Sequence, residues 1–168
     1  MSFANDTEKF NFLAAVGESF GRHPELVDLA HRLAGHLRPD DYVGRATQIH
    51  RFVRDGIKYQ RDPGQVEQLA DPISVLQRGY DDCDGKVVLA VALMRALGLE
   101  AEPHGLWQGD VLKHVQYRVR WPGSGDAPFE LRAPGGWVRG EVTIRGAELG
   151  QDPYSVPRDP ETGRLPLA

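Results

Sequence analysis

The stretch that decides the fold is residues 73–99, which read ISVLQRGYDDCDGKVVLAVALMRALGL. Within it, residues 87–97 are apolar on almost every side and are interrupted only by Arg95. A helix that is apolar all round must be buried, because any face turned to water would expose hydrophobic surface. The sequence therefore predicts one central, buried helix in this stretch.

The start of this helix coincides with the one cysteine of the chain. Asp81 or Asp82 is a suitable N-cap and Gly98 a suitable stop, so the helix is predicted to begin at or next to Cys83. A cysteine nucleophile acts as the thiolate, and the positive end of a helix dipole lowers the pKa of a thiol. The charges of Asp81, Asp82 and Asp84 work in the opposite direction. The sequence thus requires a cationic partner for Cys83 from elsewhere in the chain.

The best candidate for that partner opens a predicted strand at residues 112–121, LKHVQYRVRW. Alternation puts an apolar set on one face and His114 on the other. The apolar face holds Val115, Tyr117, Val119 and Trp121. The remaining histidines are interpreted as surface or boundary residues: His23, His31, His36, His50 and His104.

Helical patterns come first in the chain and extended patterns follow. Helices are predicted from Pro24 to about residue 37 and from residue 41 to Gly56, and strands at 112–121 and from Trp137 towards residue 144. The inner face of the second helix is expected to hold Val43, Ile49, Phe52 and Val53. This order favours a segregated α+β fold. We expect a single domain over 1–168, with a core at about 40–145 and a loosely packed tail at 150–168.

Bulk properties exclude several classes of protein. The 168 residues suit one domain, and the net charge of −4 gives no basic footprint for nucleic acid. No apolar run reaches the ~18 residues of a membrane span, and no signal peptide is visible, so we expect no membrane partner. A lone free thiol persists best in a reducing compartment, which favours a cytoplasmic location. Nothing in the pattern predicts a cofactor, and the acidic run around Cys83 is better explained as a helix cap than as a metal site.

Several motifs in combination resemble the transglutaminase-like superfamily, in particular its compact bacterial and phage-associated members. Residues 79–86, GYDDCDGK, are similar to the family's G-D-C-D-D core, and residues 92–98, ALMRALG, to the end of its buried helix. His114 and Val115 match its H-V pair, and residues 49–59 its entry helix. The likeness covers about residues 40–143. It implies a papain-like α+β core, with N-terminal helices and a central buried helix packed on an antiparallel sheet.

The resemblance also implies roles for particular residues. Cys83 takes the place of the nucleophile and His114 that of the general base and acid. The family's aspartate, within W-x-x-L-D-P-T, is replaced here, and residues 135–143, GGWVRGEVT, are the nearest match. This puts Glu141 at the acid position, with Glu130 as the alternative because residues 129–131 could form the strand that pairs directly.

The expected activity is cysteine-dependent acyl transfer on an amide or peptide bond. Hydrolysis by a protease or amidase is favoured over cross-linking, since bacterial members of the transglutaminase-like superfamily, which the sequence resembles, are commonly regarded as peptidase-like. The expected partner is a protein or peptide substrate, and the oligomeric state is left open. The alternative is a non-catalytic transglutaminase-like module with a structural or assembly role, for example in a phage tail.

Overall fold

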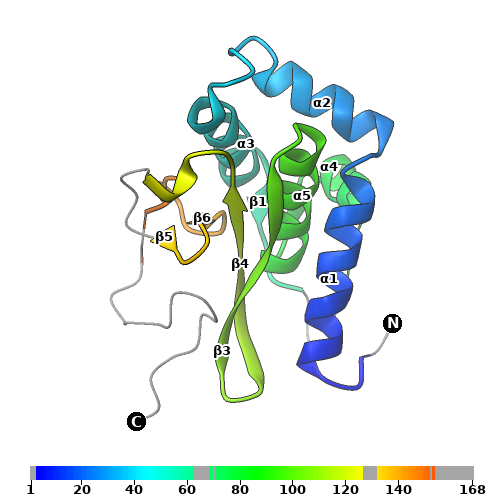
Figure 1. Cartoon of the computed structure of the whole chain (residues 1–168). Coiled ribbons are helices and arrows are strands. Elements are labelled where there is room, and N and C mark those ends of the chain that lie inside the picture. Colours follow the sequence, from blue (N-terminus) through cyan, green and yellow to red (C-terminus); the bar gives the residue numbers. More distant parts are fainter. Residues whose placement is uncertain (1–2, 63–68, 70, 127–131, 152, 154–168) are drawn as a thin grey trace.

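The computed structural model describes residues 3–62, 69, 71–126, 132–151 and 153. The main sheet forms one layer and the helices form the other, in which α5 lies next to the sheet and the remaining helices pack around it (Figure 1). The helices are α1 (Asp6–Phe20), α2 (Pro24–Ala34), α3 (Tyr42–Gly56), α4 (Pro72–Arg78) and α5 (Cys83–Ala96), with a 3-10 turn η1 (Ser124–Asp126). The strands are β1 (Lys58–Tyr59), β2 (Tyr80–Asp81), β3 (Glu100–Gln108), β4 (Val111–Arg120), β5 (Arg132–Ala133) and β6 (Trp137–Gly140).

The buried helix predicted from the sequence is α5. Every residue from Asp84 to Met94 is buried, and its sides contact α1, α2, α3, α4, β3 and β4. Asp82 is its N-cap, and Gly98, with a φ of 80°, lies just beyond its end. The predicted α+β fold with a central buried helix on an antiparallel sheet is therefore confirmed.

The main sheet has the strand order β3-β4-β6-β5 and is antiparallel throughout. Val115, Tyr117 and Val119 of β4 lie in the core, as the alternation predicted. β6 pairs with β4 in the register Tyr117↔Gly140. Continuing that register beyond the end of β6 brings Glu141 opposite Gln116 and Thr143 opposite His114. A separate two-stranded sheet pairs β1 with β2 in parallel, just before α5.

Helix α3 departs from its predicted inner face in two places. Val43 is 44% exposed, because Tyr42 packs against the core at this turn of the helix instead. His50, interpreted from the sequence as a surface or boundary residue, is fully buried. The buried stripe Ala46, Ile49, His50 and Val53 has helical spacing, so the histidine takes a core position.

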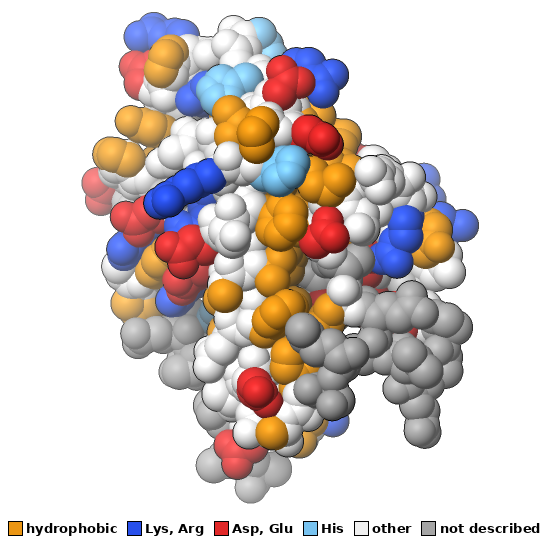
Figure 2. All heavy atoms as spheres, turned by 90° about the vertical axis from the view of Figure 1, so that its right-hand side faces the viewer, with side chains coloured by type: hydrophobic (Ala, Val, Ile, Leu, Met, Phe, Trp, Pro, Cys, Tyr) orange, Lys and Arg blue, Asp and Glu red, His pale blue; other side chains and the backbone are white. Residues whose placement is uncertain are grey.

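Helix α1, whose sequence has no clear periodicity, packs closely along α5. A Cβ on Gly17 would lie 2.8 Å from Val91 Cγ1, and one on Gly21 would lie 2.7 Å from the Cβ of Arg95. These distances are too short for any side chain, so the two glycines are what allow α1 to approach. Figure 2 views the molecule from the side on which α1 lies and shows a band of apolar side chains flanked by charged ones. Among the described residues, no helix combines the length and apolar character needed to cross a bilayer.

Candidate active site

Cys83 is the first residue of α5, and the aspartate before it caps the helix. Asp82 Oδ1 accepts hydrogen bonds from the backbone N–H groups of Asp84 and Gly85, at 3.0 and 3.3 Å. The residue before the cap is held as well, since the Asp82 N–H donates to Asp81 Oδ1 at 2.7 Å. These bonds fix the backbone on both sides of Cys83 and so fix where its partly buried thiol lies.

The Cys83 thiol lies between its own helix and β4. Its sulfur is 3.5 Å from Asp84 Oδ1, and the backbone N–H of Val115 donates a hydrogen bond to it. Because Val115 directly follows His114, this bond places the sulfur beside the segment that carries the imidazole. Burial, then the charges of Asp84 and Asp82, raise the pKa of the thiol above its ordinary value, while the Val115 N–H lowers it.

The neighbouring carboxylates are partly balanced by cations. Lys9 Nζ of α1 lies 2.7 Å from Asp84 Oδ2, and Arg78 pairs with Asp81. Burial, and then the charge of Asp84, raise the pKa of Asp82 to about 7. Carboxylate oxygens of Asp62, Asp81 and Asp82 lie within 4.8 Å of one another. Such a cluster in itself does not indicate a metal, because acidic groups often gather without one.

The imidazole of His114 is held by the residues that follow β6. His114 Nε2 is 2.7 Å from Glu141 Oε2, and since a carboxylate oxygen accepts, Nε2 is the donor. Thr143 fixes the other carboxylate oxygen, because its hydroxyl lies 2.5 Å and its backbone N–H 2.9 Å from Glu141 Oε1. The Thr143 hydroxyl is also 3.5 Å from His114 Nε2. The ring is therefore oriented through Nε2, which directs Nδ1 to the other side.

Glu141 is fully buried and lies among polar groups from several elements. Gln116 Nε2 donates to Glu141 Oε2 at 3.4 Å. Lys86 of α5 is also buried, and its Nζ donates to the carbonyls of Ile57 and Arg54 at 2.6 and 3.0 Å. Burial lowers the pKa of Lys86 to about 8, and the charges of Asp55 and Glu141 oppose that shift. The ammonium of Lys86 thus helps to offset the buried charge of Glu141.

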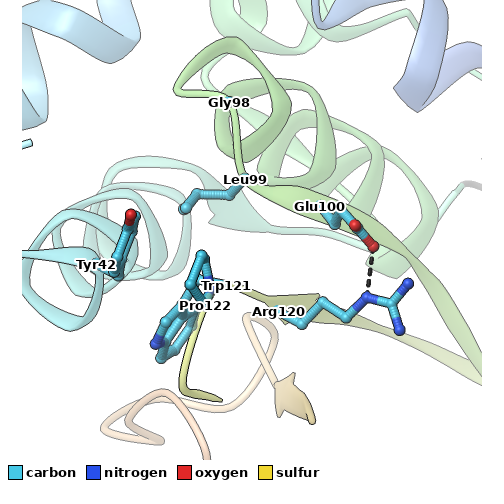
Figure 3. A pocket seen from close by; sticks show the side chains of 7 residues that line it. All are labelled: Tyr42, Gly98, Leu99, Glu100, Arg120, Trp121 and Pro122. Atoms are coloured by element: carbon cyan, nitrogen blue, oxygen red, sulfur yellow. Dashed lines mark hydrogen bonds and ion pairs between the residues drawn. The ribbon is translucent and has the colours of Figure 1, made fainter. Parts of the chain in front are cut away.

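Two cavities lie away from this cluster, at the opposite end of α5. One has a volume of about 410 Å³, and Figure 3 shows its lining side chains, with the Glu100–Arg120 ion pair at one side. It is lined by Tyr42, Gly98, Leu99, Glu100, Arg120, Trp121 and Pro122. A second cavity of about 250 Å³ shares Gly98, Leu99 and Glu100 with it. The 14 residues of α5 put these cavities ~20 Å along the helix from Cys83, so they are not part of the same site.

The structure brings His114 and Glu141 into direct contact and Cys83 against the residue after His114. Glu130, the alternative acid, lies outside the described residues. Sequence reasoning missed Lys9 and Thr143. Thr143 stands two positions after Glu141, where it could have been noticed as a local partner, whereas no local pattern connects Lys9 with α5.

Comparison with known proteins shows the family to which this chain belongs. The family model of the transglutaminase-like superfamily matches residues 28–139, well over half of the chain. The chain therefore belongs to the transglutaminase-like superfamily. The matched segment contains Cys83 and His114 and ends two residues before Glu141. A comparison with curated proteins found no significant match.

Two solved structures share the fold at low sequence identity. One is a protein of Cytophaga hutchinsonii described as a "putative cysteine protease", with a TM-score of 0.52 and 15% identity over 76% of this chain. The other is a protein of Parabacteroides distasonis described as a "putative protease", with a TM-score of 0.55 and 13% identity over 84% of this chain. This chain covers only 41% and 31% of their respective lengths.

Proposed function

We propose that the protein is a thiol-dependent hydrolase of amide or peptide bonds, with Cys83 as nucleophile, His114 as general base and acid, and Glu141 as the residue that orients the imidazole. The observation that supports this most directly is the 2.7 Å contact between His114 Nε2 and Glu141, next to the strand residue that donates to the Cys83 sulfur. Membership of the transglutaminase-like superfamily supports the same assignment.

The reaction divides into two acyl transfers. His114 Nδ1 takes the proton from Cys83 Sγ as the sulfur attacks the carbonyl carbon. The C–N bond of the substrate breaks, His114 delivers the proton to the leaving amine, and a thioester remains on Cys83. Water then attacks the thioester and His114 accepts its proton. The C–S bond breaks, His114 returns that proton to the leaving sulfur, and the carboxylic acid is released with the thiol restored.

The electrostatics of the site determine how the thiolate forms. The pKa of Cys83 is raised by burial and by Asp84, so the sulfur does not readily lose its proton to solvent. Transfer to His114 within the pair creates an imidazolium beside the thiolate, and this positive charge favours the anion. The backbone N–H of Cys83, at the first position of α5, is suited to stabilise the oxyanion that develops on the substrate.

A second candidate is a non-catalytic module with a structural or assembly role. The raised pKa of Cys83 favours it, because an inert thiol needs no activation. The two candidates differ in the reactivity of one sulfur, so they can be separated without knowledge of the substrate.

The test measures the rate of alkylation of Cys83 by iodoacetamide from pH 5 to 10. The protein unfolded in urea serves as the reference thiol, with a pKa of ~8.5. If the protein is an enzyme, the alkylation midpoint of the wild type should lie well below that of the unfolded reference. In His114→Ala the midpoint should return to the reference value or rise above it. A wild-type midpoint at or above the reference, unchanged in His114→Ala, would rule out the proposed pair and favour the module.

A panel of peptide and carboxamide substrates tests the chemistry itself, with amine release as the readout. Cys83→Ala should abolish turnover on any substrate that the wild type cleaves. Glu141→Gln keeps the shape of the side chain but removes its charge, and we expect a loss of up to about four orders of magnitude, as for a triad whose imidazole is wrongly oriented. Full activity of Cys83→Ala would contradict the proposal.

A further inference from the structure

We infer that Lys9 of α1 is a positioning residue of the active site, which acts on Cys83 through Asp84. This inference rests on the proposed function, since it assigns to Lys9 the control of a thiol that must ionise. It also gives a role to α1, which lies before the segment that the family model matches.

The first observation is a carboxylate shared between a cation and the thiol. Lys9 Nζ is 2.7 Å from Asp84 Oδ2, while Asp84 Oδ1 is 3.5 Å from Cys83 Sγ. The side chains of Lys9 and Asp84 are only 15% and 4% exposed. Charges shielded from water in this way interact more strongly than surface pairs do. Lys9 is thus well placed to offset the carboxylate that lies closest to the sulfur.

The second observation ties the same turn of α1 to the strand that carries His114. Asp6 Oδ2 accepts a hydrogen bond of 2.8 Å from the backbone N–H of Leu112, two residues before His114. Three residues later in α1, Lys9 reaches the start of α5. The first turn of α1 therefore contacts both segments of the site and holds them in a fixed relation.

The charges around the sulfur show why Lys9 should matter. Asp84 comes from α5, Asp82 from its N-cap and Asp81 from β2, and each adds negative potential. Arg78 forms an ion pair with Asp81, and Lys9 forms one with Asp84. In the proposed mechanism His114 accepts the thiol proton. A carboxylate oxygen of Asp62 lies within 4.8 Å of those of Asp81 and Asp82. Loss of Lys9 would expose a forming thiolate to the full charge of Asp84.

The experiment compares the iodoacetamide profile of Cys83 in matched variants. Lys9→Met removes the charge but keeps the length of the side chain, and we expect alkylation at pH 7 to slow by about tenfold for each unit by which the thiol pKa rises. Lys9→Arg keeps the charge and should stay within about threefold of the wild type. Lys58→Met, at an exposed lysine of β1, removes a charge of the same sign and should leave the profile unchanged.

A double variant separates electrostatics from packing. In Lys9→Met/Asp84→Asn both charges are gone, so the rate should recover to at least the wild-type value, which a loss of packing alone would not produce. The role of Lys9 would be overturned if the thiol pKa were the same in Lys9→Met as in the wild type. The proposed function would stay intact if the wild-type pKa were still lowered and still dependent on His114. A wild-type profile that does not depend on His114 would instead overturn the proposed function.

Discussion

Asp82 caps the backbone of α5 and also affects the pKa of the Cys83 thiol. Its Oδ1 accepts two N–H groups of the first helical turn, yet burial and the charge of Asp84 raise its pKa to about 7. Above pH ~7 the ionised carboxylate lies beside Cys83 and raises the pKa of that thiol. Near neutral pH, ionisation of Asp82 therefore opposes ionisation of Cys83.

Asp82→Asn should lower the pKa of Cys83. Asparagine keeps the acceptor oxygen and is as good an N-cap as aspartate, so α5 should still begin at Cys83. We expect faster alkylation than in the wild type above pH ~7, and equal rates below about pH 6, where Asp82 is already protonated. The measurement is the ratio of alkylation rates across this range. A ratio that does not change with pH would show that Asp82 does not titrate beside the sulfur.

At the residue scale, the sequence was informative where function depends on local pattern. Cys83 could be placed at a helix start because a cap, a nucleophile and a buried helix follow one another directly. The contact between His114 and Glu141 could be anticipated because residues 135–143 are the nearest match to the family's acid motif, although the family's aspartate is replaced there and Glu130 was an alternative. Lys9 could not be found in this way, since its contact with Asp84 depends on how α1 packs against α5.

Among the elements, α1 is the one whose position depends most on small residues. Gly17 and Gly21 lie against Val91 and Arg95 with no room for a Cβ, so they set the distance between α1 and α5. The same helix carries Lys9 two turns earlier. The packing of α1 against α5 should therefore determine how well Lys9 reaches Asp84.

Gly17→Ala should loosen the packing of α1 against α5. The added methyl group would meet Val91 at 2.8 Å, and overpacking of this kind costs typically about 1–3 kcal/mol. We expect a lower free energy of unfolding by urea denaturation and slower alkylation of Cys83 at pH 7. Gly56→Ala is the matched control, because a Cβ there would lie 3.5 Å from Phe52, an ordinary contact. Equal stability of Gly17→Ala and the wild type would show that α1 can shift without cost.

The sequence predicted α2, α3, α5 and β4 because each has a clear period and recognisable ends. For α1 the pattern was mixed, since its buried positions include a glycine as well as Leu13. Val43 and His50 of α3 were assigned to the wrong environments for a related reason. A period identifies a buried stripe, but only packing against the other elements decides which residue at its edge is covered.

For the whole molecule, His50 is a buried link between parts that are distant in the chain. Its Nε2 donates to the carbonyl of Ala147 at 2.8 Å, and Nδ1 lies 2.6 Å from the hydroxyl of Tyr117. A carbonyl can only accept, so Nε2 carries the hydrogen and Nδ1 accepts from the tyrosine in the neutral ring. Burial lowers the pKa of His50, which keeps the ring neutral in the folded state.

This arrangement predicts a loss of stability on acidification. In the unfolded chain His50 binds a proton near pH 6.5, whereas the folded state resists protonation, so the unfolded state binds more protons as the pH falls. The free energy of unfolding should therefore decrease below pH ~6.5, by at most about 1.4 kcal/mol per pH unit from this one group.

His50→Gln cannot titrate, so its disadvantage against the wild type should shrink between pH 7 and pH 5. Urea denaturation at each pH measures the difference. His36→Gln, at an exposed histidine, should follow the pH dependence of the wild type. A constant difference between wild type and His50→Gln would show that His50 binds a proton equally well in the folded and unfolded states.

The position of the lone sulfur also makes the native molecule suitable for spectroscopy. A spin label introduced on the unaltered chain attaches at one place, the first turn of α5, without background from other thiols. A second label at Val111, which is 50% exposed at the start of β4, would form a pair across the two segments that α1 joins. Pulsed dipolar measurements on that pair would report in solution whether the helix and the strand keep a single separation.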